Sequence, residues 1–225
     1  MKRIVQPELL DTLSPADPRA IRSRRDLRRI NSWMGNHSIM AAALQNNLDG
    51  RAPRQITELG AGDGSFLLQV AQKTNWPGIN ATLLDRQTIV SAELLATFSK
   101  LRWRAESVVA DVFDWQQTPE EIVIANLFLH HFETGRLAEL LRIISKRAKL
   151  FVAIEARRAP WPFFFSRLLW AIGCNDVTRH DATVSVRAGF AAEELSALWP
   201  DTPNWQLIER RAGLFSHLFI AQKIS

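Results

Sequence analysis

Short apolar runs and longer amphipathic stretches alternate along the chain from Gln55 onward, and this pattern predicts an α/β fold. The runs are rich in β-branched residues, as strands are, whereas the stretches between them carry apolar residues at helical spacing. The expected strands lie within residues 55–62, 80–85, 105–113, 120–129 and 148–156, and the expected helices within 65–74, 88–101 and 134–147. Strands that alternate with helices form a parallel sheet with both faces covered.

The two ends of the chain depart from this alternation. Residues 1–50 lack strand-like runs, and from about Asp17 apolar residues recur at three- to seven-residue intervals, which predicts a helical N-terminal cap. Near the other end, residues 205–213 and 215–222 resemble two strands joined by a short turn, which predicts a hairpin. We therefore expect a doubly wound, mostly parallel, seven-stranded sheet, Rossmann-like, with a C-terminal antiparallel hairpin.

The composition is that of a soluble globular protein with one sizeable core. Of the 225 residues, 47% are hydrophobic and 23% charged, which excludes a disordered chain and a disulfide-stapled miniature protein. We expect a single domain over residues 1–225, in which the cap (1–50) is followed by a ligand-binding half (51–156) and a substrate-binding segment with the hairpin (157–225). A single cysteine, Cys174, and the absence of a long apolar run favour a cytoplasmic location.

A glycine-rich turn follows the first expected strand. In ITELGAGDGSF the strand ends near Glu58, and a helix begins at about Ser65. Between them lie Gly60, Gly62 and Gly64. Glycines let the backbone approach a ligand closely, and the N–H groups at the start of the helix face whatever is bound. A dinucleotide-binding fingerprint would need its third glycine at position 65, where this chain has serine.

The spacing E-x-G-x-G-x-G instead resembles the first motif of the class I methyltransferases that use S-adenosylmethionine (SAM). The resemblance implies an α/β enzyme in which residues 51–156 form the SAM-binding half. It implies that the SAM site is lined by the strand-end acid and the residues of the turn, namely Glu58, Gly60, Ala61, Gly62 and Gly64.

The same resemblance requires an acid at the end of the second strand, where it would accept hydrogen bonds from the ribose diol of SAM. Asp85 takes this place, followed by Arg86. Asp85 comes 21 residues after Gly64, close to the roughly 20 residues expected by analogy with dinucleotide-binding folds. We therefore expect Asp85 and Arg86 at the cofactor site.

Two further strand ends complete the pattern. The third expected strand ends beside Asp111 and Val112, and the resemblance places both residues next to the adenine of SAM. It implies that the Asp111 carboxylate faces the exocyclic amine and that the Val112 N–H faces a ring nitrogen. The fourth ends at Asn126, which the resemblance places at the reaction centre. The motifs occur in order at successive strand ends, and they cover residues 55–156.

The segment NLFLHHFE, which begins at Asn126, resembles the corresponding segment of small-molecule methyltransferases, notably those of ubiquinone and menaquinone biosynthesis and relatives that modify phenols. Because no proline follows Asn126, it does not resemble the segment of enzymes that methylate amino groups of bases or amides. The resemblance implies methyl transfer to a small hydrophobic acceptor, phenolic or quinone-type, with oxygen as the favoured position and no metal. C-methylation of an aromatic ring, RNA methylation and non-catalytic SAM binding are the alternatives.

Three histidines are candidate general bases for the acceptor's proton. His180 is the first choice, because it lies in a polar stretch behind an apolar segment and the adjacent Asp181 could orient its imidazole. His131 is the second choice and His130 the third; because they are adjacent, we expect one to face the pocket and the other to pack. Ordinary packing or hydration is the alternative for each.

The apolar segment PWPFFFSRLLWAIG, residues 160–173, is too short to cross a bilayer. As a helix beginning near Pro162 it would be apolar nearly all round. Such a helix suits a lid over an apolar acceptor or a contact with a membrane surface. Packing in the core is the alternative interpretation.

Positive charge is concentrated near the N-terminus. The chain has 28 Lys and Arg against 23 Asp and Glu, a net charge of +5, and six arginines lie within residues 19–29. On a helix, Arg24, Arg28 and Asn31 share one face. One interpretation is that the arginines form a solvated helix face paired to Asp26. The other is that Arg28 or Asn31 reaches the SAM carboxylate or closes the cap over the pocket. A stripe that binds a polyanion is the third interpretation of these arginines. Nucleic acid is the last choice of partner, because no aromatic residues interleave with the arginines. The oligomeric state stays open.

Overall fold

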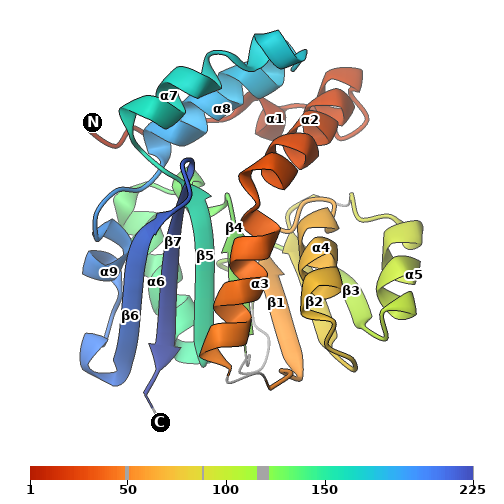
Figure 1. The fold of residues 1–225 in the computed structure, drawn as a ribbon, viewed down its shortest axis with the longest axis vertical. Coiled ribbons are helices and arrows are strands. Elements are labelled where there is room, and N and C mark those ends of the chain that lie inside the picture. The colour runs from red at the N-terminus through yellow and green to blue at the C-terminus, as the bar shows by residue number, and fades with distance from the viewer. Residues whose placement is uncertain (49–50, 88, 116–121, 225) are drawn as a thin grey trace.

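A computed structural model describes residues 1–48, 51–87, 89–115 and 122–224, and the strands among them form one sheet of seven (Figure 1). Their order across the sheet is β3-β2-β1-β4-β5-β7-β6. The strands are β1 (Gln55–Leu59), β2 (Asn80–Asp85), β3 (Arg104–Val109), β4 (Ile122–Asn126), β5 (Leu150–Ala156), β6 (Trp205–Ala212) and β7 (Ser216–Lys223). Strands β1 to β5 pair in parallel, whereas β7 is antiparallel to β5 and β6.

This topology confirms the predicted fold class, including the C-terminal hairpin. The chain adds β2 and β3 on one side of β1 and then crosses to β4 on the other side. The order of strands therefore reverses between β1 and β4. In open α/β sheets, ligands bind outside the carboxyl ends of the strands at such a point.

Helices cover both faces of the sheet and also its carboxyl edge (Figure 1). The α-helices are α1 (Leu9–Thr12), α2 (Pro18–Met34), α3 (Asn36–Asn47), α4 (Ser65–Thr74), α5 (Ala92–Lys100), α6 (Thr134–Arg147), α7 (Pro160–Ser166), α8 (Asp176–Ala188) and α9 (Glu194–Leu198). Short 3-10 turns form η1 (Leu129–His131), η2 (Leu169–Ile172) and η3 (Thr202–Asn204). Thr88, Glu120 and Glu121, at the starts of an expected helix and an expected strand, lie outside the described residues, as do residues 49–50 of the expected cap.

The core has two parts, one on each face of the sheet. In β4, Ile122 and Ile124 pack in the part that contains α3 and α4, whereas Val123 and Ala125 pack in the part that contains α6. Alternate residues of a strand point to opposite faces, so a strand buried on both faces is apolar throughout. This explains why the central strands are continuous apolar runs in the sequence.

The N-terminal segment is helical, as predicted, but its helices lie at different parts of the sheet. Helix α2 begins after Asp17, whose carboxylate accepts the Arg19 N–H at 2.8 Å as an N-cap. It ends at Gly35, which takes the left-handed conformation (φ 69°) and turns the chain into α3. Helix α2 lies over the carboxyl edge with α1, α7 and α8, whereas α3 lies along the sheet (Figure 1). Met40 and Leu44 of α3 belong to the sheet's own core.

The apolar segment 160–173 does not form the single helix that its composition predicted. Helix α7 begins at Pro160 and ends at Ser166, and η2 follows after Arg167 and Leu168. The core-packing interpretation is also wrong for most of its large side chains, because six of them are exposed. In the part of the chain that the structure describes, no helix is long and apolar enough to cross a membrane.

Candidate functional site

The glycine turn joins β1 to α4 at the carboxyl edge of the sheet, and its backbone requires glycine. Gly60, Gly62 and Gly64 all have positive φ, at 65°, 55° and 76°. A Cβ at Gly60 would overlap the ring of Phe128, and a Cβ at Gly64 would lie 2.8 Å from Cδ1 of Leu83. The turn is thus packed between the segment after β4 and the side chains of β2.

Asp85, at the end of β2, holds this turn in place. One carboxylate oxygen accepts the Gly62 N–H and the other accepts the Gln87 N–H, both at 2.8 Å. A carboxylate has about four lone-pair sites, so both oxygens can still accept further hydrogen bonds. The adjacent Arg86 is exposed.

Glu58 is the penultimate residue of β1 and is 2% exposed. Burial raises its pKa well above the ordinary value, and the negative charges of Asp63 and Asp85 raise it further. Its Oε2 atom has no hydrogen-bond partner among the described residues. The buried, unsatisfied oxygen makes this end of β1 favourable for a ligand that donates a hydrogen bond.

Asp111 and Val112 follow β3, the next strand across the sheet from β2. Asp111 is partly buried and its Oδ1 accepts the Phe113 N–H at 3.0 Å, which fixes a tight turn. Val112 is buried. The structure therefore places Asp85 and Asp111 at neighbouring strand ends, as the sequence motifs required.

Asn126, at the end of β4, is tied to the junction of α2 and α3. Its Oδ1 accepts from Nδ2 of Asn36 at 3.0 Å, and Oδ1 of Asn36 accepts the Ser216 hydroxyl at 2.6 Å. Asn36 is fully buried. This chain of hydrogen bonds connects the fourth strand, the start of α3 and the C-terminal hairpin.

Helix α2 reaches the glycine turn through Arg28. Its guanidinium Nη1 lies 2.5 Å from Oδ2 of Asp63, which stands between Gly62 and Gly64. Asn31, one turn further along α2, has a buried Oδ1 without a hydrogen-bond partner among the described residues. Because residues three positions apart share a face of a helix, Asn31 lies on the same side of α2 as Arg28.

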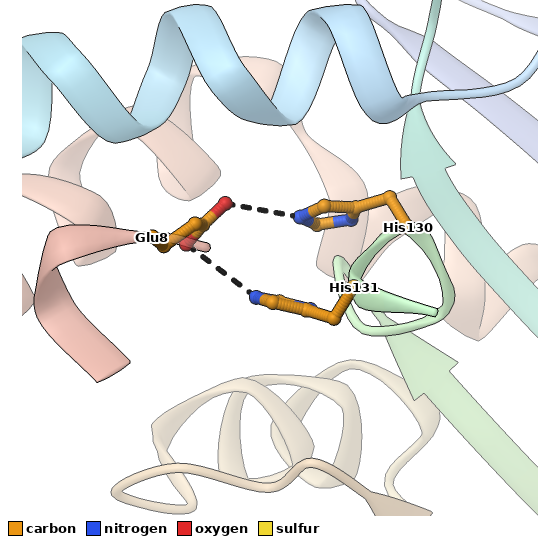
Figure 2. Close-up of side chains that lie close together, drawn as sticks. All are labelled: Glu8, His130 and His131. Carbon is orange, nitrogen blue, oxygen red and sulfur yellow. Dashed lines mark hydrogen bonds and ion pairs between the residues drawn. The ribbon is translucent and has the colours of Figure 1, made fainter. Parts of the chain in front are cut away.

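A cluster of histidines and carboxylates lies beyond the end of β4 (Figure 2). Nδ1 of the buried His130 lies 2.7 Å from Oε2 of Glu155, and its Nε2 lies 3.2 Å from Oε1 of Glu8. Glu155 comes from β5, and Glu8 immediately precedes α1. The N-terminal segment is thereby attached to the carboxyl edge of the sheet.

The charges of this cluster are coupled. Burial alone would lower the pKa of His130, but the hydrogen bonds and charges of Glu155 and Glu8 outweigh it and raise the pKa to about 10. Burial alone would raise the pKa of Glu8, but its bonds to His130 and His131 outweigh burial and lower it. At neutral pH His130 is therefore an imidazolium between two carboxylates. In that state it cannot accept a proton.

His131 stacks on His130, with ring centroids 4.3 Å apart, and is partly exposed. Its Nδ1–H donates to the Phe128 carbonyl at 2.9 Å, since a carbonyl oxygen only accepts. Its Nε2 lies 3.5 Å from Oε2 of Glu8 and 3.7 Å from Oδ2 of Asp11. Burial and the neighbouring imidazolium lower its pKa, but these carboxylates prevail and the pKa is raised.

His180 lies on α8, and nearly half of its side chain (47%) is exposed. Its Nδ1 is 2.9 Å from Oδ1 of Asp181, so Asp181 orients the imidazole as its position in the sequence suggested. Asp181 is itself buried, and its two oxygens accept the N–H groups of Leu9 and Leu10 at 2.8 and 2.9 Å. Asp181 therefore also holds the first turn of α1 against α8.

No family model matches the chain. Trans-aconitate 2-methyltransferase of Mycolicibacterium gilvum (strain PYR-GCK) is 33% identical over 88 residues, which are 39% of this chain and 31% of that protein. The match therefore spans less than a third of the relative's length. The plantazolicin methyltransferase BpumL, solved in complex with SAH, superposes with a TM-score of 0.68 at 13% identity, over 92% of this chain and 91% of the other.

Two further solved structures are similar. An O-methyltransferase family protein from Burkholderia thailandensis gives a TM-score of 0.61 at 18% identity, over 93% of this chain and 61% of the other. The mitomycin 7-O-methyltransferase MmcR gives 0.64 at 20% identity, over 95% and 60%. The chain has the class I methyltransferase fold. The resemblance carried by the E-x-G-x-G-x-G turn is therefore confirmed at the level of the fold.

Several residues at this edge of the methyltransferase fold were not found from the sequence. Glu155 left a signal, because it is the only charged residue in the otherwise apolar strand β5. Asn36 and Glu8 could not be identified from the sequence, because nothing in their local sequence distinguishes them from surface residues of a helix or a terminal segment. Their partners lie 90 and 122 positions away in the chain.

Proposed function

We propose that the protein transfers a methyl group from SAM to a small hydrophobic acceptor. The observation that carries this proposal is the fixed glycine turn at the switch point of a methyltransferase fold, with Asp85 bound to the Gly62 N–H. The acids Glu58, Asp85 and Asp111 stand at the ends of three adjacent strands, as the SAM motifs require. The fold alone would support many activities, so the proposal rests on these groups.

The residues of the site fit SAM chemically. SAM carries positive charge on its sulfonium and on its amino group, and the turn offers Glu58, Asp63 and Asp85 close together. The unsatisfied Oε2 of Glu58 suits a donor from the ligand. We assign the ribose diol to Asp85 and the adenine edge to Asp111 and Val112. We assign the SAM carboxylate to Arg28 or Asn31 on α2.

When bound, SAM supplies a methyl group already activated on positive sulfur, and the chain has to position the acceptor and handle its proton. His130 is charged at neutral pH, so it holds its proton and fixes the segment after β4. The base is then His131 or His180, each with Nδ1 engaged in a hydrogen bond. We favour His131, because it lies five positions after Asn126 in the segment that follows β4, whereas His180 lies on an exposed face of α8. The pKa of His131 is raised, so it accepts the acceptor's proton only in its neutral form, whose share grows as the pH rises.

We propose oxygen of a phenolic or quinone-type acceptor as the methylated atom. Two of the similar structures are described as O-methyltransferases, one of them acting on mitomycin, and this supports transfer to oxygen. C-methylation of an electron-rich ring would use the same site and is the alternative.

The decisive experiment incubates the purified protein with methyl-labelled SAM and a panel of phenols and hydroquinones, followed by mass spectrometry. We expect label in a phenolic product, with one SAH formed for each methyl group transferred. Label on ring carbon would move the reaction to C-methylation, and label in added RNA would favour an RNA methyltransferase. Tight SAM binding without any labelled product from the panel or a metabolite extract would indicate a non-catalytic SAM-binding protein.

A further inference from the structure

Helix α7 and η2 present six large apolar side chains to solvent. Two indoles dominate it, Trp161 at 71% exposure and Trp170 at 62%. We propose that this surface docks on an anionic phospholipid membrane. We name it the α7–η2 patch; it consists of Trp161, Phe164, Phe165, Leu168, Trp170 and Ile172. The inference does not depend on the proposed methyl transfer.

The orientation of α7 is the reverse of that of an ordinary surface helix. Trp161, Phe164 and Phe165 recur at helical spacing, and such a stripe normally faces the core. Here the buried residues of α7 are instead Pro162 and Ser166. The side of α7 that packs inward therefore carries a proline and a serine, while Trp161, Phe164 and Phe165 are left uncovered.

The inward side of α7 contacts α8. The Ser166 hydroxyl lies 3.4 Å from that of Thr183 on α8, and Arg187 of α8 lies over the ring of Phe163. Helix α8 in turn packs against η1, which carries His130 and His131. Helices α7 and α8 lie side by side at the top of Figure 1. The packing on α8 thus uses the inward side of α7 and leaves its exposed aromatic side available to a partner.

The aromatic rings of the patch support one another. The centroids of Trp161 and Phe165 are 6.3 Å apart, and those of Phe164 and Phe165 are 5.8 Å apart. Phe165 also meets the ring of Phe215 in the hairpin turn at 5.6 Å, and Leu214 beside it is 71% exposed. Contiguous apolar surface of this kind marks an interaction site, because exposed apolar area is unfavourable in water.

Arginines border the patch where η2 meets α2. Arg22 donates to the Gly173 carbonyl at 3.1 Å, and Arg29 donates to the Ile172 carbonyl at 3.5 Å. Arg167 lies between α7 and η2, and Arg179 lies on α8; both are exposed. Positive charge at the rim of an apolar surface is complementary to the phosphates of an anionic bilayer.

Two features of the patch, besides the arginines at its border, favour a lipid surface over other partners. Tryptophan is enriched at membrane interfaces, where its ring lies in the apolar boundary and its N–H in the headgroup region. The patch also contains the aliphatic Leu168 and Ile172, which suit acyl chains better than nucleic-acid bases. Because no described helix can span a bilayer, the contact is peripheral.

The test is co-sedimentation of the protein with vesicles of phosphatidylcholine alone and with vesicles that contain a quarter phosphatidylglycerol. We expect binding to the anionic vesicles that weakens as salt is added. The double variant Trp161→Ser, Trp170→Ser should bind at least about tenfold more weakly, because both indoles leave the interface. Ile224→Ser is the matched control, since Ile224 is 58% exposed near the C-terminus, at the opposite end of the molecule (Figure 1).

Circular dichroism verifies that each variant is folded, and Phe164→Ser with Leu168→Ser serves as a second pair if the first is not. Equal sedimentation of wild-type protein and both patch variants with anionic vesicles would overturn the proposal. So would a dimer that dissociates on patch substitution without any vesicle binding, since a second copy would then cover the surface. Patch-dependent retention of RNA in the absence of vesicle binding would overturn it as well.

Discussion

Nδ1 of His130 lies 2.7 Å from Oε2 of Glu155, and neither side chain is more than 3% exposed. The other oxygen of Glu155 accepts the backbone N–H groups of Phe128 and Leu129 at 2.9 and 2.7 Å. One carboxylate on β5 therefore fixes both the charge of His130 and the path of the chain after β4. Phe128, held in this way, packs against Gly60 of the glycine turn.

Replacing Glu155 with glutamine should be strongly destabilising. The variant keeps the shape of the side chain but removes one of the two counter-charges of His130, and breaking a buried ion pair costs about 3–5 kcal/mol. Glu8 still faces Nε2 of His130, so we expect the lower end of that range in the free energy of unfolding, measured by urea denaturation. Glu139→Gln, which breaks the exposed pair with Arg136, should cost less than about 1 kcal/mol. Equal losses in the free energy of unfolding of the two variants would contradict a stabilising ion pair between His130 and Glu155.

Stability should fall as the solution becomes alkaline. The pKa of His130 is about 10 in the folded protein and 6.5 as the reference value, so its contribution is complete below pH 6.5. Between pH 6.5 and about 10 the folded state holds a proton that the unfolded state has lost. The free energy of unfolding then declines by up to about 1.4 kcal/mol per pH unit. Subtracting the profile of His130→Gln isolates this contribution, and parallel profiles for wild type and variant would refute it.

The carboxyl edge of the sheet was largely predictable because its chemistry is local in the sequence. Glu58 lies at the end of β1 with Gly60 directly after the strand, Asp85 is the last residue of β2, and Asp111 comes two positions after β3. Parallel strands bring such ends together without further information.

The histidine cluster was only half predictable. His130 and His131 were singled out, but the protonation of His130 depends on Glu8 and Glu155, which reach it from distant segments. Periodicity does not specify which segment of the N-terminus packs on η1. The outward orientation of α7 was equally hidden, because an aromatic stripe has the same spacing whether it faces the core or solvent.

Asp85→Ala should weaken SAM binding. The substitution removes charge-assisted hydrogen bonds to the ribose and also frees the Gly62 N–H, so we expect a loss of roughly 1.5–3 kcal/mol. Calorimetric titration with SAM measures it, with Glu139→Ala as the exposed-acid control. Undiminished affinity in Asp85→Ala would remove the ribose from this residue.

Arg28→Gln should loosen the cap over the glycine turn. The substitution breaks the ion pair with Asp63, which joins α2 to that turn, and it removes a candidate partner of the SAM carboxylate. We expect weaker SAM binding, by up to about tenfold for a partly exposed charged contact. Arg25→Gln, three positions earlier on the same helix, is the control. If both variants bind SAM like the wild type, α2 takes no part in cofactor binding.

The last prediction concerns the general base. General-base assistance is worth about 10² to 10⁴ in rate, whereas a structural histidine would reveal itself in stability. His131→Ala should therefore lower kcat while the affinity for SAM stays close to that of the wild type. Tm should fall only modestly, because His131 is partly exposed and Glu8 keeps its bond to His130. The deficit should shrink at pH values above the pKa of the phenol, since the acceptor then ionises unaided.

His180→Ala is the comparison variant, because His180 belongs to the same set of predicted bases and its removal leaves Asp181 bound to α1. If His180→Ala loses turnover at neutral pH while His131→Ala keeps it, the base lies on α8, and the polar stretch behind the apolar segment is the acceptor site. Should both variants remain fully active, positioning of the acceptor against the methyl group suffices for catalysis, and the two histidines serve binding or packing. Measuring the turnover of both variants from pH 6 to 10 would also distinguish the general base from His130. Loss of the proton from His130, whose pKa is about 10, changes the stability of the fold and not the ionisation of the acceptor.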